Sequence, residues 1–226
     1  MAFVFIAGGT GFLGRALAAE LVRRRHRVRA LVRAGSENRA PAGCELVVGD
    51  PLDSASYLRF IGVADTFIEL VGVSHPSPAK ASLFRSVDLA AAKAGVDAAS
   101  HAGIRHFVYI SVAHPAPVMK EYIAARSEAE EYIRAANLNA TILRPWYVLG
   151  PGRRWPLALM PLYWIFGLLP QTRDSARRLG LVTVSQMVET MARSVEQPPT
   201  GIRVLEVPQI RAAALSGDLR RGSSAR

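Results

Sequence analysis

The sequence predicts an α/β protein built on a doubly wound parallel sheet, with a small C-terminal lobe. Short runs rich in β-branched and aromatic residues alternate with longer stretches in which apolar residues recur at helical spacing. A glycine-rich segment, residues 8–14, separates the first such run from the first helical stretch. Half of the 226 residues are hydrophobic and a fifth are charged, which is enough apolar material for one packed core.

Six strands and four helices account for the chain up to residue 144. The expected strands are residues 2–7, 27–33, 45–48, 65–71, 105–111 and 138–144. The expected helices are residues 12–25, 53–60, 80–102 and 118–136. Because strands that alternate with helices are joined by right-handed crossovers, their carboxyl ends should share one rim of the sheet, and ligands should bind along that rim.

The composition changes near residue 145, where a segment rich in Pro, Gly and Trp begins. We therefore predict a sheet domain at 1–150, a small substrate or lid lobe packed on the same domain at 151–210, and a flexible tail at 211–226. The apolar segment 155–169 is broken by Pro161 and is too short for a membrane span. Four interpretations stay open for it: a cover over the cleft, an apolar substrate pocket, a homodimer contact, or a peripheral membrane contact.

The charge and the cysteine content exclude several classes of function. The net charge of +10 comes from basic residues spread along the chain, without a recognition helix or interleaved aromatic residues, so we expect no nucleic-acid partner. Cys44 is the only cysteine, and no Cys/His cluster has the spacing of a metal site. No basic stretch precedes the first apolar run, so we expect a cytoplasmic protein without a signal peptide.

The glycine-rich segment has the spacing of a dinucleotide-binding turn. Gly8, Gly11 and Gly14 permit a tight turn, a close approach of the backbone to a pyrophosphate, and packing of the helix on the strand. Free N–H groups at the start of that helix favour the phosphates. The sequence thus predicts a Rossmann fold with a dinucleotide cofactor held by the following residues: Gly8, Thr10, Gly11, Phe12, Leu13 and Gly14.

Arg33 ends the second expected strand, where an NAD-specific site would have an acidic residue on the ribose 2′-hydroxyl. A guanidinium at this position suits a 2′-phosphate, so the cofactor is expected to be NADP(H), with NAD(H) as the alternative. Arg15 is a second candidate phosphate contact. An ordinary solvated arginine at the start of a loop is the simpler interpretation of Arg33.

The chain resembles the atypical or extended short-chain dehydrogenase/reductases, in their NAD(P)H-binding, epimerase-like group. The resemblance covers residues 1 to about 150 and rests on Arg33 and on the segments 8–14, 49–53, 107–111 and 143–145. It implies that Asp50 and Pro51 lie against the adenine. It also implies that the ribose and pyrophosphate are flanked by Leu70, Val71, Gly72 and Val73, and that the nicotinamide pocket is lined by Pro145, Trp146, Tyr147 and Val148.

The resemblance also implies a catalytic group, because active members carry Tyr-x-x-x-Lys on the helix after the fifth strand, near a Ser or Thr. Here Tyr122 is followed four residues later by Arg126, and Ser111 ends the expected strand. A cation on the same helical face stabilises the phenolate, but arginine stays protonated and cannot relay a proton. Tyr122 is the expected proton donor, with Ser111 polarising a carbonyl and Arg126 supplying charge.

Two functions from different classes follow. The first is an NADP(H)-dependent oxidoreductase or epimerase-like enzyme that acts on a small carbonyl or hydroxyl compound. The second is a non-catalytic NADP(H)-binding module that senses redox state or serves an assembly, and the replacement of the lysine favours it. His75, Lys80 and His114 lie in loops expected at the same rim and are further candidates for a site.

Overall fold

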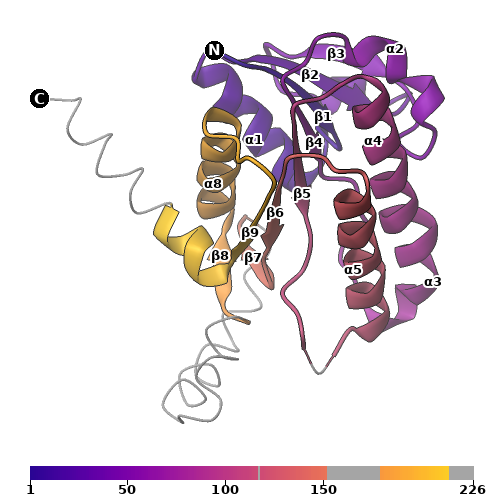
Figure 1. The fold of residues 1–226 in the computed structure, drawn as a ribbon, viewed down its shortest axis with the longest axis vertical. Helices are drawn as coiled ribbons and strands as arrows, with labels where there is room; N and C mark the ends of the chain where they lie inside the picture. The colour runs from indigo at the N-terminus through magenta and orange to yellow at the C-terminus, as the bar shows by residue number, and fades with distance from the viewer. Residues whose placement is uncertain (117, 152–178, 214–226) are drawn as a thin grey trace, which may run out of the picture.

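The computed structural model describes residues 1–116, 118–151 and 179–213. Its main feature is a sheet of seven strands in the order β3-β2-β1-β4-β5-β6-β9, in which every neighbouring pair is parallel (Figure 1). The strands are β1 (Phe3–Ala7), β2 (Arg27–Val32), β3 (Glu45–Val48), β4 (Thr66–Glu69), β5 (His106–Ile110), β6 (Ala140–Arg144) and β9 (Ile202–Glu206). The predicted doubly wound sheet is confirmed.

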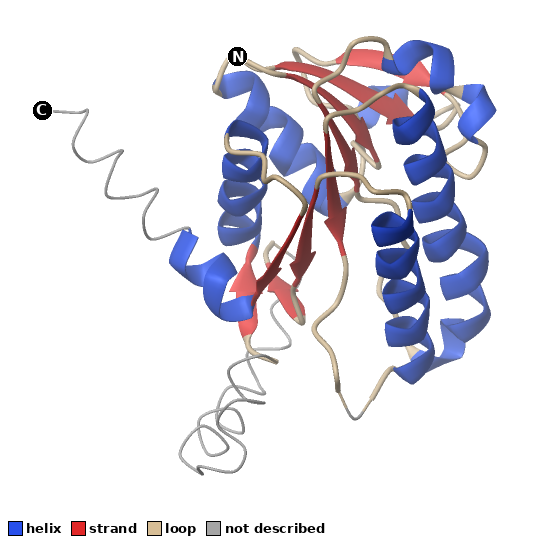
Figure 2. Ribbon diagram, in the orientation of Figure 1, coloured by secondary structure: helices blue, strands red, loops and turns tan. Residues whose placement is uncertain are grey.

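Helices cover both faces of this sheet (Figure 2). One face carries α1 (Phe12–Arg23) and α8 (Val184–Glu196), and the other carries α2 (Leu58–Ile61), α4 (Ala90–His101) and α5 (Lys120–Ala135). Short elements lie in the connections: the 3-10 turns η1 (Glu37–Arg39), η2 (Ser54–Ser56) and η3 (Pro78–Lys80), then α3 (Ala81–Leu83) and a π-helical stretch, η4 (Phe84–Leu89), which leads into α4. Residues 207–213, after β9, are also helical.

Aromatic side chains in register hold the centre of the sheet. Phe5, Phe67 and Phe107 are direct neighbours on β1, β4 and β5, and their rings stack with centroids 5.2 and 5.4 Å apart. All three are fully buried on the α4 face. Such stacks add to the free energy of burial, so the central strands, whose ends carry the site, are rigidly placed.

The C-terminal part of the described chain differs from the prediction. Six strands are confirmed, but β9 adds a seventh beside β6, and β7 (Tyr147–Leu149) and β8 (Leu181–Thr183) form a separate parallel pair. Part of the predicted lobe, 151–210, therefore belongs to the main sheet. The first helix is also shorter than expected, since Arg25 takes a positive φ of 65° and ends the helical path.

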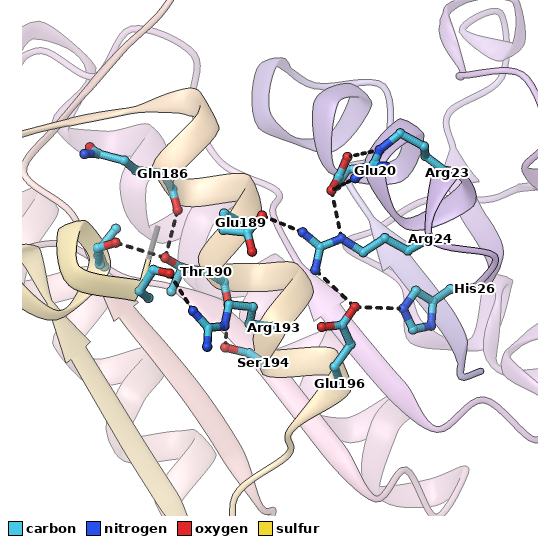
Figure 3. A network of polar contacts seen from close by, with 12 residues as sticks. Glu20, Arg23, Arg24, His26, Gln186, Glu189, Thr190, Arg193, Ser194 and Glu196 are labelled. Carbon is cyan, nitrogen blue, oxygen red and sulfur yellow. Dashed lines mark hydrogen bonds and ion pairs between the residues drawn. The ribbon is translucent and has the colours of Figure 1, made fainter. Parts of the chain in front are cut away.

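Helix α8 is fixed to α1 by a polar network (Figure 3). Arg24 contacts Glu20 at 2.8 Å, Glu189 at 2.5 Å and Glu196 at 3.0 Å, and the Arg24 and Glu189 side chains are largely buried. At the other end of α8, the Thr183 hydroxyl accepts the Gln186 N–H while the Gln186 side chain accepts the Thr183 N–H. This capping box starts the helix where β8 ends.

The chain passes from β3, at one side of β1, to β4 at the other. At such a reversal the two connections leave in opposite directions, and a crevice opens at the carboxyl ends of the strands. Segment 155–169 lies outside the described residues. Within the described ranges, no helix combines the length and apolar character of a membrane span.

Candidate functional site

A cavity of about 380 Å³ lies at the carboxyl ends of β1, β4, β5 and β6. It brings together most of the residues singled out from the sequence, from five separate parts of the chain. Those on its wall are Gly8, Gly11, Phe12, Leu13, Gly14, Leu70, Gly72, Val73, His75, Ser111, Tyr122, Arg126, Pro145, Trp146, Tyr147 and Val148.

Gly8, Gly11 and Gly14 of the turn are required for different reasons. Gly8 has a φ of 83°, and Gly14 packs so tightly that a Cβ there would lie 2.1 Å from the Gly8 carbonyl oxygen. At Gly11 a Cβ would meet only that oxygen, at 3.1 Å, and Gly11 is exposed on the cavity wall. The protein's own packing thus explains Gly8 and Gly14, whereas Gly11 leaves room for a ligand.

The start of α1 suits an anionic ligand in this space. Gly11 is the N-cap, so no side chain caps the first N–H groups of the helix, and the first turn contains no acidic residue. The N–H groups at the start of a helix and the helix dipole both attract phosphate. The residues present therefore fit the pyrophosphate of a dinucleotide.

Five predicted cofactor residues are not on the cavity wall: Thr10, Arg33, Asp50, Pro51 and Val71. Arg33 follows β2, is exposed, and has no side-chain partner among the described residues. The Asp50 carboxylate accepts the Leu52 N–H at 2.9 Å, which shapes the turn after β3. The roles of these five residues stay predictions.

Tyr122 lies on the cavity wall near the start of α5. Its ring packs edge-on against Phe84, with centroids 4.9 Å apart, and the Arg126 guanidinium carbon lies 5.2 Å from its centroid. The expected pairing of this tyrosine with a cation one helical turn later is thus present.

Arg126 is buried and makes its hydrogen bonds inside the protein. It is 6% exposed and forms an ion pair with Asp88, while Nη1 donates to the Ile110 carbonyl at 2.9 Å and to the Tyr109 hydroxyl at 3.2 Å. Burial opposes its charge, but Tyr109, Tyr122 and Asp88 outweigh burial and raise the pKa of Arg126. The guanidinium is therefore a fixed charge at the cavity wall, held by partners inside the protein.

Ser111 is also engaged by the protein. Its hydroxyl donates to Glu130 at 2.6 Å, and Glu130 additionally forms ion pairs with Arg134 at 2.9 Å and Arg144 at 2.5 Å. Burial alone would raise the pKa of Glu130, but the hydrogen bonds from Arg144 and Ser111 outweigh it and lower that pKa to about 2. In this arrangement the Ser111 proton points to Glu130, and a role of Ser111 toward a substrate carbonyl stays a prediction.

The remaining loop candidates have different positions. His75 lines the cavity, and Lys80 donates to the Ser74 carbonyl at 2.6 Å, which shapes the same loop. His114 lies 3.6 Å from Glu130 and is not on the wall. Of these three residues, His75 is the one that lines this cavity.

The sequence analysis missed three buried acids behind the site, Glu69, Asp88 and Glu130. Each is 1% exposed, and burial raises the pKa of Glu69 to about 8. A sequence signal existed for two of them, since Glu69 ends an otherwise apolar strand and Asp88 interrupts the apolar start of a helix. Charged residues on buried faces are rare unless they are paired, so these positions indicate a polar network.

A second hollow, of about 660 Å³, lies between α1, β7 and the start of α8. Its wall includes Pro151, the last described residue before the gap at 152–178. It shares no residue with the cavity at the strand ends. We assign it no ligand.

Comparisons with known proteins agree with this geometry. The model of an NAD(P)H-binding family matches residues 8–153. A ceramide reductase of Caulobacter vibrioides is 29% identical over 201 residues, which are 88% of this chain and 62% of that protein. The chain thus spans less than two thirds of the length of this relative.

Solved structures share the fold. The enzyme WbmH of Bordetella bronchiseptica, in complex with NAD+, has a TM-score of 0.68 at 20% identity, over 91% of this chain and 75% of the other. UDP-glucose 4-epimerase of Thermus thermophilus, in complex with NAD, has a TM-score of 0.65 at 17% identity, over 94% and 82% of the two chains. The chain therefore belongs to the NAD(P)H-binding family and has the fold of the extended, epimerase-like short-chain dehydrogenase/reductases.

Proposed function

We propose that the protein is an NADP(H)-dependent oxidoreductase that interconverts a carbonyl and a hydroxyl group on its substrate. The observation that carries this proposal is the cavity that joins the Gly8–Gly14 turn to Tyr122. The exposed Arg33 after β2 supports NADP(H) over NAD(H), because a guanidinium binds a 2′-phosphate with charge-assisted hydrogen bonds. The name of the Caulobacter relative makes ceramide-type ketones the first substrate class to test.

In this proposal the chain's own residues orient the reactants and move the proton. The turn and the start of α1 hold the pyrophosphate, and the wall from Pro145 to Val148 faces the nicotinamide end. The bound cofactor supplies or accepts the hydride. Tyr122 donates the proton to the carbonyl oxygen, and the Arg126 charge, 5.2 Å from its ring, stabilises the resulting phenolate.

A second function is favoured by a specific observation. The Ser111 hydroxyl is bound to Glu130, and Arg126 is bound to Asp88, so two of the three expected catalytic groups are engaged within the protein. A module that binds NADP(H) without turnover, as a redox sensor or a part of an assembly, would have this arrangement.

Turnover of NADPH separates the two functions. Oxidation is measured by loss of nicotinamide fluorescence with a panel of small ketones and of ceramide-type ketones in detergent micelles. For an enzyme, Tyr122→Phe should leave the NADPH affinity nearly unchanged and lower turnover by about 100-fold or more. Tight NADPH binding without oxidation of any panel member would support the module, and full turnover by Tyr122→Phe would exclude Tyr122 as the proton donor.

The contact through 155–169 is a separate proposal, argued from composition alone. An apolar segment flanked by arginines suits an anionic lipid surface or a second copy of the chain. Flotation with anionic liposomes at low and high salt tests the lipid contact, and light scattering tests the dimer.

A further inference from the structure

The loop that connects β4 to the next helical turn, Leu70 to Val73, forms one wall of the cofactor cavity. Its conformation is set from behind by buried charged side chains. The Val71 N–H donates to the Glu69 carboxylate at 2.7 Å, and the Val73 N–H donates to the Asp88 carboxylate at 3.0 Å. Two donors of the loop, from the alternate residues Val71 and Val73, therefore face into the protein, away from the cavity.

Asp88 and Arg126 together connect this loop to a second wall. One carboxylate oxygen of Asp88 accepts the Val73 N–H, and the other pairs with Nη2 of Arg126. The second nitrogen of the guanidinium, Nη1, donates to the carbonyl of Ile110, the last residue of β5. One planar group thus fixes the distance between the end of β5 and the loop after β4.

Gly72 shows how closely the pair supports the loop. A Cβ at Gly72 would lie 2.4 Å from Nη2 of Arg126 and 3.0 Å from Oδ1 of Asp88. The φ of Gly72 is not in the left-handed region, so the reason for a glycine here is contact with the ion pair rather than backbone conformation. The guanidinium, which contacts Gly72 closely, therefore sets the position of the loop relative to the cavity.

A buried ion pair is a costly way to stabilise a fold. Both side chains are almost fully buried, and the loss of hydration can exceed the attraction between them. Apolar residues of similar volume would fill the space at least as well. The charged pair instead provides directional hydrogen bonds, because each carboxylate oxygen accepts and each guanidinium nitrogen donates in a defined direction.

We propose that Asp88 and Arg126 are positioning residues for the cofactor: their ion pair holds Gly72 and Val73 in the position in which the cavity can bind the dinucleotide. Arg126 lines the cavity, and in this role it acts through the loop. The proposal rests on the proposed binding of NADP(H). It predicts that lysine at position 126 is a poor substitute, because an ammonium cannot reach Asp88 and Ile110 with two separate donors.

The test combines hydrogen exchange of the loop with nucleotide affinity in Asp88→Asn and in Arg126→Lys. Exchange of the Val73 amide in the nucleotide-free protein should become at least about 10-fold faster in both variants, since its hydrogen bond is weakened. The Kd for NADPH should rise about 10- to 100-fold. With a reactive substrate, KM for NADPH should rise in parallel in Asp88→Asn, while kcat of this variant at saturating NADPH changes little.

Two additional variants make the result specific. Arg24→Ala removes ion pairs between α1 and α8 and destabilises the fold elsewhere, so it should leave both Val73 exchange and the NADPH Kd unchanged. If Asp88→Asn does not fold, the double variant Asp88→Asn/Arg126→Gln replaces it, because it leaves neither charge of the pair without its partner. In this variant too, exchange of the Val73 amide should become faster and the Kd for NADPH should rise.

Each outcome decides one question. Unchanged Val73 exchange in Asp88→Asn would overturn the positioning role, as would faster exchange with wild-type NADPH affinity. An Arg126→Lys variant with undiminished affinity and higher turnover would show that residue 126 acts as the lysine of the superfamily does. A wild-type protein that binds neither NADPH nor NADH would instead overturn the proposed function.

Discussion

Glu69 ends β4 with a carboxylate that is buried and that receives one hydrogen bond, from the Val71 N–H. Burial raises its pKa from the ordinary value of 4.5 to about 8, and the nearby charge of Arg126 only partly opposes this. Between these two values the folded protein keeps a proton that the unfolded chain releases. Glu69 therefore costs stability as the pH rises from about 4.5 to about 8.

Replacement by glutamine removes this cost, because glutamine has the shape of the protonated acid and still accepts the Val71 N–H. Glu69→Gln should raise the free energy of unfolding relative to wild type by about 1 to 3 kcal/mol more at pH 8 than at pH 5. Urea denaturation at the two pH values measures the difference. The same effect at both values would mean that Glu69 does not titrate in this range.

Arg33 tests the choice of cofactor. Arg33→Ala should weaken NADPH binding by about 10- to 100-fold and leave NADH binding nearly unchanged, because only NADPH carries the 2′-phosphate. Arg59→Ala is a matched control, since Arg59 is also exposed but lies on α2. Calorimetry with both nucleotides gives the affinities, and equal wild-type affinity for the two would contradict the assignment to NADP(H).

At this scale the sequence was informative about which residues meet and less informative about what they do. The spacing of Tyr122 and Arg126 correctly placed both on one face of a helix, and both line the cavity. It could not reveal that Arg126 turns to Asp88, because that contact joins residues 38 positions apart. The engagement of Ser111 by Glu130 is non-local in the same way.

In the turn between β1 and α1, we expect Gly11 to be needed for ligand binding and Gly14 to be needed for folding. Gly11→Val should abolish NADPH binding while the melting temperature stays within a few degrees of wild type, because the added side chain fills ligand space. Gly14→Ala should destabilise the protein by about 1 to 3 kcal/mol, because its Cβ would lie against the backbone of Gly8. Thermal denaturation and calorimetry on both variants check this contrast, which fails if Gly11→Val binds NADPH or if Gly14→Ala is as stable as wild type.

Elements up to β6 were predictable because each repeats one pattern, an apolar run followed by an amphipathic helix. The later elements lack this pattern. β8 has only three residues. β9 has five residues, and none of these five is buried, so neither strand has a strong apolar signature. For α8 a local signal was present in Thr183 and Gln186, the two ends of a capping box, and it would have located the start of the helix.

Across the whole molecule, the Arg24 network joins the first helix to α8, which is about 160 residues away in sequence. Arg24→Ala should lower the free energy of unfolding by about 1 to 3 kcal/mol, because it leaves Glu189 largely buried without its cation. Arg23 provides the control: its side chain is 59% exposed and, among the described residues, forms its ion pair with Glu20 alone, so Arg23→Ala should cost about 0 to 1 kcal/mol. Similar losses in the two variants, measured by urea denaturation, would contradict this role.

The position of β9 has a consequence for synthesis on the ribosome. The strand that covers the open edge of β6 begins almost sixty residues after β6 ends, and α8, which packs against α1 on the same face of the sheet, is made in the same interval. At roughly 5 to 20 residues per second, translation needs about 3 to 12 seconds to supply β9. During that time the nascent chain presents an unpaired parallel edge and a bare apolar helix face, which are the features that chaperones bind and that cause neighbouring nascent chains to associate.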